Sequence, residues 1–270
     1  MRREAESIGS HNVLVGLFIL IMLGLSSRVF AIEAVYTGFN APTGLASGPD
    51  GALYISNWAG GTVERIAIDG ARTIFSNAIA SPAGIVVDKT ASVYVSSYSG
   101  DHITRIDPDG KHTRIAENLA TPTGLSFSAD GHLLIANRAS GEVLSLNLQT
   151  GERRVLFDSF SLPVGVVEMP DRSLVVSQYG GRVTRVMPDG SRQELGQSFV
   201  RPGVGILVDG ADAVLVIDNG AGLVRRVTFD GRSSEVSEKL PGSAVALGRD
   251  YNGNLMVGTW GTGALFRIGK

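Results

Sequence analysis

The chain contains no cysteine, so disulfide bonds, thiolate nucleophiles and zinc sites with cysteine ligands are excluded. It also lacks an excess of positive charge, because its 270 residues carry 24 Lys and Arg against 26 Asp and Glu side chains, spread evenly along the sequence. Proteins that hold a phosphate backbone need basic patches, so we do not expect nucleic-acid binding. Long runs with apolar residues at a spacing of about 3.6 are absent, so helices are not expected.

The sequence signatures of common catalysts are missing as well. There is no G-x-S-x-G nucleophile elbow, no glycine-rich phosphate loop and no EF-hand spacing. The four histidines, His11, His102, His112 and His132, form no cluster with metal-ligand spacing. Motifs therefore identify no catalytic residue and no metal ligand.

The N-terminus has the pattern of an export signal. Two arginines precede an apolar run, Val13–Leu25, which is too short to span a membrane as a helix. Val29 and Ala31 then occupy the −3 and −1 positions of a signal-peptidase site. We predict that residues 1–31 are a signal peptide cleaved after Ala31, and that residues 32–270 are exported to the periplasm or the medium. Two early glutamates weaken the positive segment, so an uncleaved anchor is the alternative.

The remaining sequence is a repeat of about 40 residues. Proline recurs at intervals of 39 to 41 residues, and a similar segment follows each one: Pro42, Pro82, Pro122, Pro163, Pro202 and Pro241. In the first copy, PTGLASGPDGALYISNW leads into four β-type runs separated by turn dipeptides: Thr43–Ser47, Leu53–Asn57, Val63–Ile68 and Arg72–Phe75. Each copy therefore predicts a four-stranded meander.

Six such meanders predict an all-β fold, a six-bladed β-propeller with four-stranded antiparallel blades. The last copy ends at its third strand, Ala264–Ile268, and the segment Ile32–Phe39 resembles the fourth strands of other copies. We therefore expect the N-terminal strand to complete the last blade, which pairs an otherwise open sheet edge. The propeller accounts for residues 32–270 as one domain.

A pair of residues at the end of each second strand is expected at one mouth of the propeller axis. The pairs share hydrogen-bonding and aromatic side chains and are Asn57-Trp58, Ser97-Tyr98, Asn137-Arg138, Gln178-Tyr179, Asp218-Asn219 and Thr259-Trp260. Such a ring is the composition of a pocket for a polar organic ligand. The structural alternative is that the amides cap backbone groups and the aromatic rings wedge between sheets.

Asp218 differs from the residues that precede the ring in the other copies, which are small: Ser56, Ser96, Ala136, Ser177 and Gly258. A carboxylate facing the axis would need a cation, a metal or water, because an unpaired buried charge is costly. Arg138 is the candidate partner. The alignment slips by one residue in this copy, so Asn219 is the alternative ring member, with Asp218 beside it.

Arginine recurs in the third strand of five copies, at Arg65, Arg105, Arg185, Arg226 and Arg267, with Ser145 as the exception. A residue repeated at equivalent positions suits structural pairing better than one asymmetric site. We expect salt bridges between blades and packing of the arginine stems.

The P-x-G-(I/L) start, the D-G turn, the (L/V)-Y-(I/V)-S strand and the V-x-R-I strand resemble NHL-repeat propellers. They are also similar to the gluconolactonase (regucalcin-like) family and, in the phrase P-D-G-A-L-Y, to the virginiamycin B lyase family. The resemblance covers the whole predicted propeller and implies that fold, whereas activity depends on the individual site.

The gluconolactonase resemblance implies a divalent metal at the axis, held by carboxylates and an amide that include the residue between the proline and the glycine. Those positions hold Thr43, Ala83, Thr123 and Val164, followed by the altered Pro202-Gly203 and Pro241-Gly242, and none is a carboxylate or amide. The lyase resemblance implies a histidine over the axis, and no ring position holds one.

Three functions of different classes follow. The first is a non-catalytic, monomeric, exported propeller that binds a small molecule, glycan or protein at its axial face, without a cofactor and without membrane contact after cleavage. The alternative is a lactone hydrolase or lyase with a rearranged site that uses Asp218, Asn57 and Asn137, with a calcium or magnesium ion as its candidate cofactor. A purely structural docking module is the third. Whether the protein is an enzyme is left open at this point.

Overall fold

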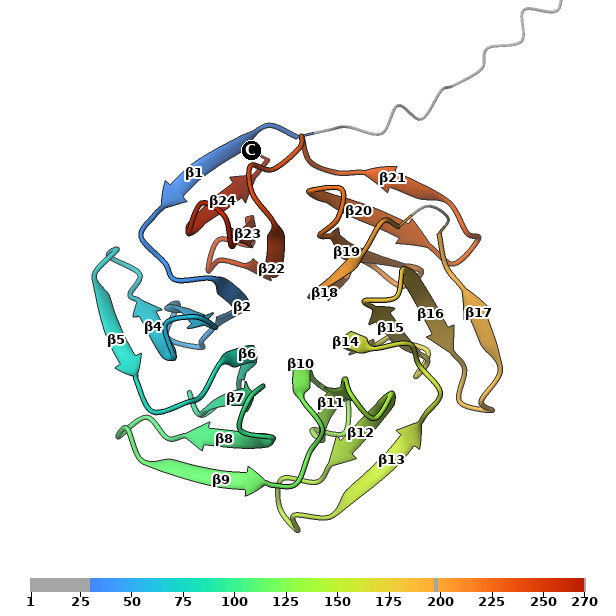
Figure 1. The fold of residues 1–270 in the computed structure, drawn as a ribbon, viewed down its shortest axis with the longest axis horizontal. Coiled ribbons are helices and arrows are strands. Elements are labelled where there is room, and N and C mark those ends of the chain that lie inside the picture. The colour runs from blue at the N-terminus through green and yellow to red at the C-terminus, as the bar shows by residue number, and fades with distance from the viewer. Residues whose placement is uncertain (1–29, 197–198, 270) are drawn as a thin grey trace, which may run out of the picture.

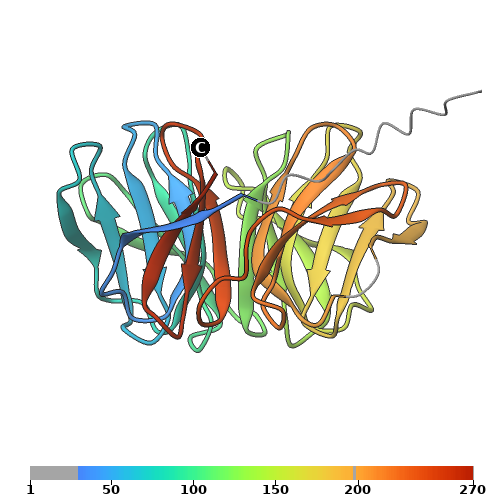
Figure 2. The ribbon, with the colours of Figure 1, turned by 90° about the horizontal axis from the view of Figure 1, so that it is seen from above.

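The computed structural model describes residues 30–196 and 199–269, which form twenty-four strands and no helix. The strands make six four-stranded antiparallel sheets, arranged as blades around a central axis (Figure 1). This confirms the predicted six-bladed β-propeller. Seen from the side, the strands run between two loop-bearing faces, so residues at equivalent strand ends gather on one face (Figure 2).

Blade one shows the order from the axis outward: β2 (Pro42–Ser47), β3 (Leu53–Asn57), β4 (Thr62–Ile66) and β5 (Arg72–Ser76). Blades two and three are β6 (Pro82–Val87), β7 (Val93–Ser97), β8 (His102–Ile106), β9 (His112–Ala116), β10 (Pro122–Phe127), β11 (Leu133–Asn137), β12 (Glu142–Leu146) and β13 (Arg153–Phe157). Blades four and five are β14 (Pro163–Glu168), β15 (Leu174–Gln178), β16 (Arg182–Val186), β17 (Arg192–Glu194), β18 (Pro202–Val208), β19 (Ala213–Asp218), β20 (Leu223–Thr228) and β21 (Ser233–Glu235).

Blade six is built from both ends of the chain. Its strands are β22 (Ala244–Arg249), β23 (Leu255–Thr259), β24 (Ala264–Ile268) and, outermost, β1 (Ile32–Tyr36). Strand β1 pairs antiparallel with β24, with Ile32 opposite Ile268, and Arg267 donates to Glu33 at 2.6 Å. The expected closure of the last blade by the N-terminal strand is confirmed, and it removes an open sheet edge.

The apolar core lies between neighbouring blades rather than within one. One cluster joins Tyr54 and Val63 of blade one to Ile85, Val93 and Val95 of blade two, and similar clusters fill the other inter-blade spaces. A single sheet could not bury both of its faces, so the ring as a whole provides the core.

The glycine of the repeated P-x-G start is required because the inner strands almost touch around the axis. A Cβ on Gly84 would lie 2.2 Å from the carbonyl oxygen of Thr123 in the next blade, and one on Gly44 would lie 2.5 Å from that of Ala83. The same contact carries a hydrogen bond, because the Ser96 hydroxyl donates to the Thr123 oxygen at 2.6 Å. The sequence motif therefore fixes the spacing of the blades.

The third-strand arginines pair within a blade, so the predicted salt bridges between blades are wrong for them. Arg65 lies 2.6 Å from Asp50 in its own sheet, and Arg226 lies 2.6 Å from Asp209 in its own. The reason is local, because the acidic turn after the first strand lies beside the third strand. Arg185 does contact the next blade, through its guanidinium, which lies 3.7 Å from the ring centroid of Phe229.

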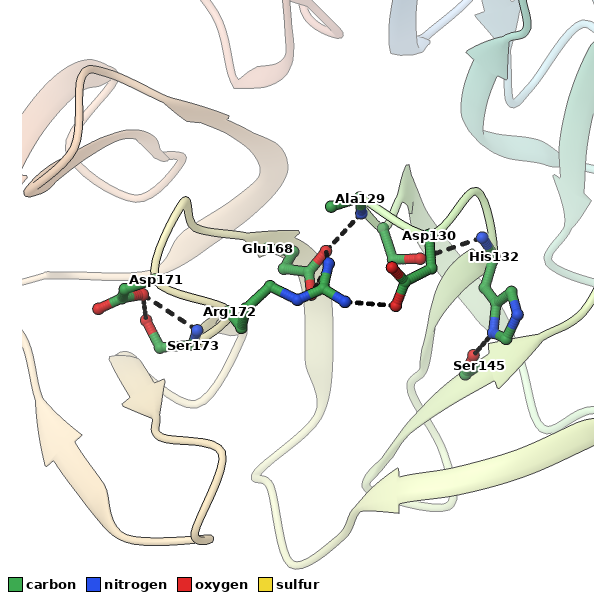
Figure 3. Close-up of polar contacts among 9 residues, drawn as sticks. Ala129, Asp130, His132, Ser145, Glu168, Asp171, Arg172 and Ser173 are labelled. Carbon is green, nitrogen blue, oxygen red and sulfur yellow. Dashed lines mark hydrogen bonds and ion pairs between the residues drawn. The ribbon is translucent and has the colours of Figure 1, made fainter.

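A different arginine joins two blades, on the face where the first and second strands meet in turns. Arg172 of the β14–β15 turn forms an ion pair with Asp130 of the β10–β11 turn, and it lies 3.3 Å from Glu168 (Figure 3). Glu168 also accepts a hydrogen bond from the backbone N–H of Ala129 at 2.5 Å. We call this the turn face, and the opposite face, where the inner strands begin, the cavity face.

Candidate functional site

A cavity of about 250 Å³ lies over the axis on the cavity face. Its floor is made by the first residues of the inner strands, including Thr43, Ala83, Thr123 and Val164. Its wall is made by side chains from all six blades, which the ring closure brings together from positions far apart in the sequence.

The two residues of each predicted pair occupy different places. The second members line the cavity, and we call them the rim residues: Trp58, Tyr98, Arg138, Tyr179, Asn219 and Trp260. The first members are buried and do not line it, and we call them the anchor residues: Asn57, Ser97, Asn137, Gln178, Asp218 and Thr259. Consecutive residues of an extended chain point to opposite sides, so only one of each pair faces the cavity.

Anchor residues hold the segment that leads into their own blade. Asn57 accepts a hydrogen bond from the backbone N–H of Asn40 at 3.3 Å, Asn137 from that of Ala120 at 2.8 Å, and Gln178 from that of Ser161 at 2.7 Å. Each of these three N–H groups lies two residues before a repeat proline. This is the backbone capping that the structural alternative described.

The same role extends to Ser97, which donates to the carbonyl oxygen of Ala80, also two residues before a proline, at 2.8 Å. Thr259 of blade six differs, because its hydroxyl bonds to that of Thr262 in the loop after β23.

The capped segments need this support because the backbone there is strained. The residue before the proline has a left-handed φ at Ala41, Ser81, Thr121 and Leu162, between 47° and 58°. A residue before proline normally adopts an extended conformation, and the left-handed region costs of order 1–3 kcal/mol for a side-chain-bearing residue. The anchors therefore fix a backbone conformation at the cavity mouth.

Asp218 is an anchor residue, and Asn219 is the rim residue of blade five. Pro202 pairs with Asp218 as Pro42 pairs with Asn57, so the slipped alignment is correct and the comparison of Asp218 with small residues was wrong. The position of Ser56 is taken here by Ile217.

The charge of Asp218 is compensated inside blade five rather than by Arg138. Its carboxylate, which is fully buried, accepts hydrogen bonds from Arg225 Nε at 3.0 Å and from the backbone N–H groups of Arg201 and Val200 at 3.0 and 3.2 Å. Arg138 was the partner expected from the sequence, and it lies elsewhere on the rim, where it donates to Tyr98 Oη at 3.0 Å.

Three aromatic rings form one half of the cavity wall, from blades six, one and two. Trp58 and Trp260 are stacked, with centroids 5.4 Å apart and planes 23° from parallel, and Tyr98 meets Trp58 edge to face at 6.1 Å. Trp260 also donates from Nε1 to the hydroxyl of Thr43 at 3.1 Å. These contacts hold the rings in place while they face the cavity.

The other half of the wall, from blades three to five, carries positive charge. The guanidinium carbons of Arg138 and Arg201 lie 5.2 and 5.1 Å from the ring centroid of Tyr179. Arg201 donates to Tyr179 Oη at 3.0 Å. Sequence reasoning missed Arg201 because it precedes a proline rather than ending a second strand. Its repeat position holds uncharged residues in the preceding copies, Ala41, Ser81, Thr121 and Leu162, so the lone charge was the available signal.

The donor set of the cavity does not fit a divalent metal ion. Calcium and magnesium take carboxylate and carbonyl oxygens as protein ligands, and no carboxylate lines the cavity in residues 30–196 and 199–269. Over the same residues, no group of three or more His, Cys, Asp or Glu side chains could hold a metal. The calcium or magnesium ion suggested by the gluconolactonase resemblance has no carboxylate ligand in this cavity among those residues.

The described histidines lie away from the cavity. His102 is buried on β8 with Nδ1 2.8 Å from the carbonyl oxygen of Gly100, and His112 is on β9. His132 Nδ1 lies 3.1 Å from the hydroxyl of Ser145, near the turn face (Figure 3). His11 is outside the described residues. The described part of the chain also holds no helix long and apolar enough to cross a membrane.

Three solved structures with the same fold are enzymes by title. A streptogramin B lyase is 14% identical with a TM-score of 0.67, covering 88% of this chain and 97% of its own. A catalytically inactive histidine-to-alanine variant of virginiamycin B lyase from Staphylococcus aureus, with quinupristin, is 17% identical with a TM-score of 0.67, covering 89% and 88%. A gluconolactonase from Xanthomonas campestris is 20% identical with a TM-score of 0.76, covering 88% and 89%.

At these identities the structures establish the fold alone. A search of curated protein sequences gives no match. The sequence profile of the virginiamycin B lyase family matches residues 32–270, the whole of the propeller, and the chain therefore belongs to the virginiamycin B lyase family.

Proposed function

We propose that this protein binds a small polar organic molecule in the cavity over the propeller axis. The observation that carries the proposal is the convergence of six rim residues, one from each blade, on a single cavity of about 250 Å³. The anchor residues hold the backbone beneath them, so the wall is formed before a ligand arrives, as is usual for small-molecule sites. A cavity of this size favours a small molecule over a folded protein or a long glycan as its occupant.

Binding without catalysis is favoured by the chemistry of the wall. Lyase and hydrolase reactions need a group that moves a proton, most often histidine or a carboxylate. No histidine, aspartate or glutamate lines the cavity in the part of the chain that the structure describes. The relative solved with quinupristin is inactive after replacement of one histidine. The buried positions of Asp218, Asn57 and Asn137 also argue against the catalytic roles suggested for them.

Membership in the lyase family supports a lyase or lactone hydrolase as the second candidate. Such an enzyme would have to use the phenol groups of Tyr98 or Tyr179, which are the titratable oxygen groups that reach this cavity. Both phenol oxygens accept a hydrogen bond from an arginine at 3.0 Å.

Export to the periplasm or medium is part of the proposal and rests on the sequence. Most of the signal peptide, residues 1–29, lies outside the described residues. Strand β1 begins at Ile32, immediately after the predicted cleavage site, so cleavage after Ala31 would leave the strand that closes blade six intact. Mass spectrometry of the protein from the fractionated source cell would test this, with Ile32 as the expected first residue.

The binding experiment can use the protein's own fluorescence, because both of its tryptophans, Trp58 and Trp260, line the cavity. We expect compounds from a library of small polar metabolites to shift this fluorescence and to raise Tm, since a ligand selective for the folded state stabilises it. Binding should weaken in Trp58→Leu and Trp260→Leu. Hits that bind these variants unchanged would overturn the proposal.

The enzymatic alternative is tested in parallel. Lactones and cyclic depsipeptides are incubated with the protein with and without EDTA, and products are followed by mass spectrometry. Turnover that disappears in Tyr98→Phe or Tyr179→Phe would establish the second candidate. Turnover that requires added magnesium or calcium would contradict the mismatch between this cavity and a metal ion.

A further inference from the structure

The cavity wall is divided into an aromatic half and a cationic half. Trp260, Trp58 and Tyr98 come from blades six, one and two, whereas Arg138 and Arg201 come from blades three and five, on either side of Tyr179 of blade four. A ligand that fills the cavity must therefore meet flat apolar rings on one side and two positive charges on the other.

The two cavity arginines lack an acidic partner. Most arginines of the chain form ion pairs, as Arg185 does with Asp171 and Arg225 with Asp218. Among residues 30–196 and 199–269, neither Arg138 nor Arg201 lies within ion-pair distance of a carboxylate. No carboxylate among these residues balances their charge in the cavity wall.

Their hydrogen-bonding capacity is also largely unused. A guanidinium carries five N–H donors in a planar fork that matches the geometry of a carboxylate or phosphate. Arg138 donates one side-chain hydrogen bond, to Tyr98 Oη, and Arg201 donates one, to Tyr179 Oη, within the described residues. These bonds and the contacts with the Tyr179 ring orient both groups without neutralising them.

We propose that the ligand of this cavity is a small organic oxyanion with a planar unsaturated or aromatic body. Its anionic group is bound by Arg138 and Arg201, and its body packs against Trp58 and Trp260. The inference rests on the proposed function and adds to it the chemical class of the ligand. It follows from unpaired charge and unused donors on one side of the cavity and stacked rings on the other.

The test compares matched acids and amides. The probes are benzoate and trans-cinnamate with their uncharged amides, benzamide and trans-cinnamamide, and also phenyl phosphate; affinity is measured by calorimetry and tryptophan fluorescence. We expect each carboxylate to bind at least about tenfold more tightly than its amide, because charge-assisted bonds to guanidinium are strong. Comparing phenyl phosphate with benzoate distinguishes a phosphate from a carboxylate ligand.

Variants assign the preference to the two arginines. Arg138→Gln and Arg201→Gln should each reduce acid binding about tenfold and leave amide binding almost unchanged. Lys111→Gln is the matched control, because it removes one positive charge from an exposed turn on the opposite face. Arg138→Lys keeps the charge but not the fork, and it should retain part of the preference. It also serves as a folded reference if a Gln variant is unstable.

The outcomes separate this inference from the proposed function. Equal binding of acids and amides, with no effect of either Gln variant, would overturn the oxyanion while leaving a binding cavity. Equal losses in Arg138→Gln and Lys111→Gln would also overturn it, because the preference would then follow net charge. Absence of any binding by the probes and by the metabolite library would overturn both.

Discussion

Each blade ends its second strand with two adjacent residues that do different work. The anchor residue is buried, and in blades one to five it bonds to the backbone leading into the blade, whereas the rim residue beside it faces the cavity. Asparagine stands at both kinds of position, as the anchor Asn57 and the rim residue Asn219, so residue type alone does not separate them. The alternation of an extended chain does, because adjacent side chains point to opposite sides. A change at an anchor should therefore lower stability, and a change at a rim residue should lower ligand affinity.

The largest expected effect is at the charged anchor. Asp218→Ala removes the partner of Arg225 and the acceptor for the backbone N–H groups of Val200 and Arg201. Loss of one member of a buried ion pair leaves a charge uncompensated, so we expect the free energy of unfolding to fall by about 3 kcal/mol in urea denaturation. The neighbouring Asn219→Ala should cost about 1 kcal/mol or less. Equal losses of stability at Asp218 and Asn219 would contradict the division between anchor and rim residues.

The next effect is at a neutral anchor. Asn57→Ala leaves the backbone N–H of Asn40 and the buried carboxylate of Glu64 without their amide partner. We expect a loss of about 2 kcal/mol, because buried groups left unsatisfied carry their desolvation cost. Trp58→Phe, one residue away, should change Tm less and ligand affinity more. A stable Asn57→Ala protein with weakened ligand binding would assign Asn57 to the site instead.

A smaller effect is expected at blade two, where both members of the pair carry a hydroxyl group. Ser97→Ala removes one hydrogen bond to the carbonyl oxygen of Ala80 and should cost about 1 kcal/mol of stability. Tyr98→Phe removes the acceptor for Arg138, so it should alter oxyanion affinity with almost no change in Tm. Thermal unfolding with calorimetric titration of both variants measures the two effects. The reverse pattern would contradict the division of roles.

The smallest effect is expected at Asp171, a carboxylate on the turn face that holds the β14–β15 turn by accepting hydrogen bonds from Ser173. Hydrogen bonds from the Ser173 hydroxyl and N–H, with the charge of Arg185, lower the pKa of Asp171 below its ordinary value of 3.8. A lowered folded-state pKa adds stability that is present above the unfolded-state pKa and is lost as the pH falls through the folded value. Asp171→Asn should therefore lose less Tm than the parent protein between neutral pH and about pH 3. An identical acid profile would show that this carboxylate contributes nothing.

The fold was predictable because each repeat carries its own local signals for strands and turns. The recurring proline, the D-G turns and the unfinished last copy predicted the blades and their closure by the segment Ile32–Phe39, and the structure confirms both, with β1 at Ile32–Tyr36. The glycine of the P-x-G start is explained only in three dimensions, where Gly44, Gly84, Gly124 and Gly165 meet the next blade.

The sequence predicted where the site lies, but not which of its residues line the cavity and which are buried. All six rim residues were named from the sequence, together with six anchors that lie beneath the surface. The misplacement of Asp218 came from one extra residue in blade five, and Arg201 was passed over because it belongs to the strand start. The sequence did not reveal the ion-pair partners of Arg65 and Arg226. These partners depend on which turn lies beside the third strand, and that placement is a property of the folded sheet.

The pairing of β1 with β24 determines when the ring of blades can close during synthesis. Glu33 and Arg267, which meet across this pair, are 234 positions apart in the sequence. During synthesis β1 cannot pair with β24 until β24 has been made, and contacts of such separation form slowly. The ring of blades, and with it the cavity over the axis, is therefore complete only after β24 has joined β1.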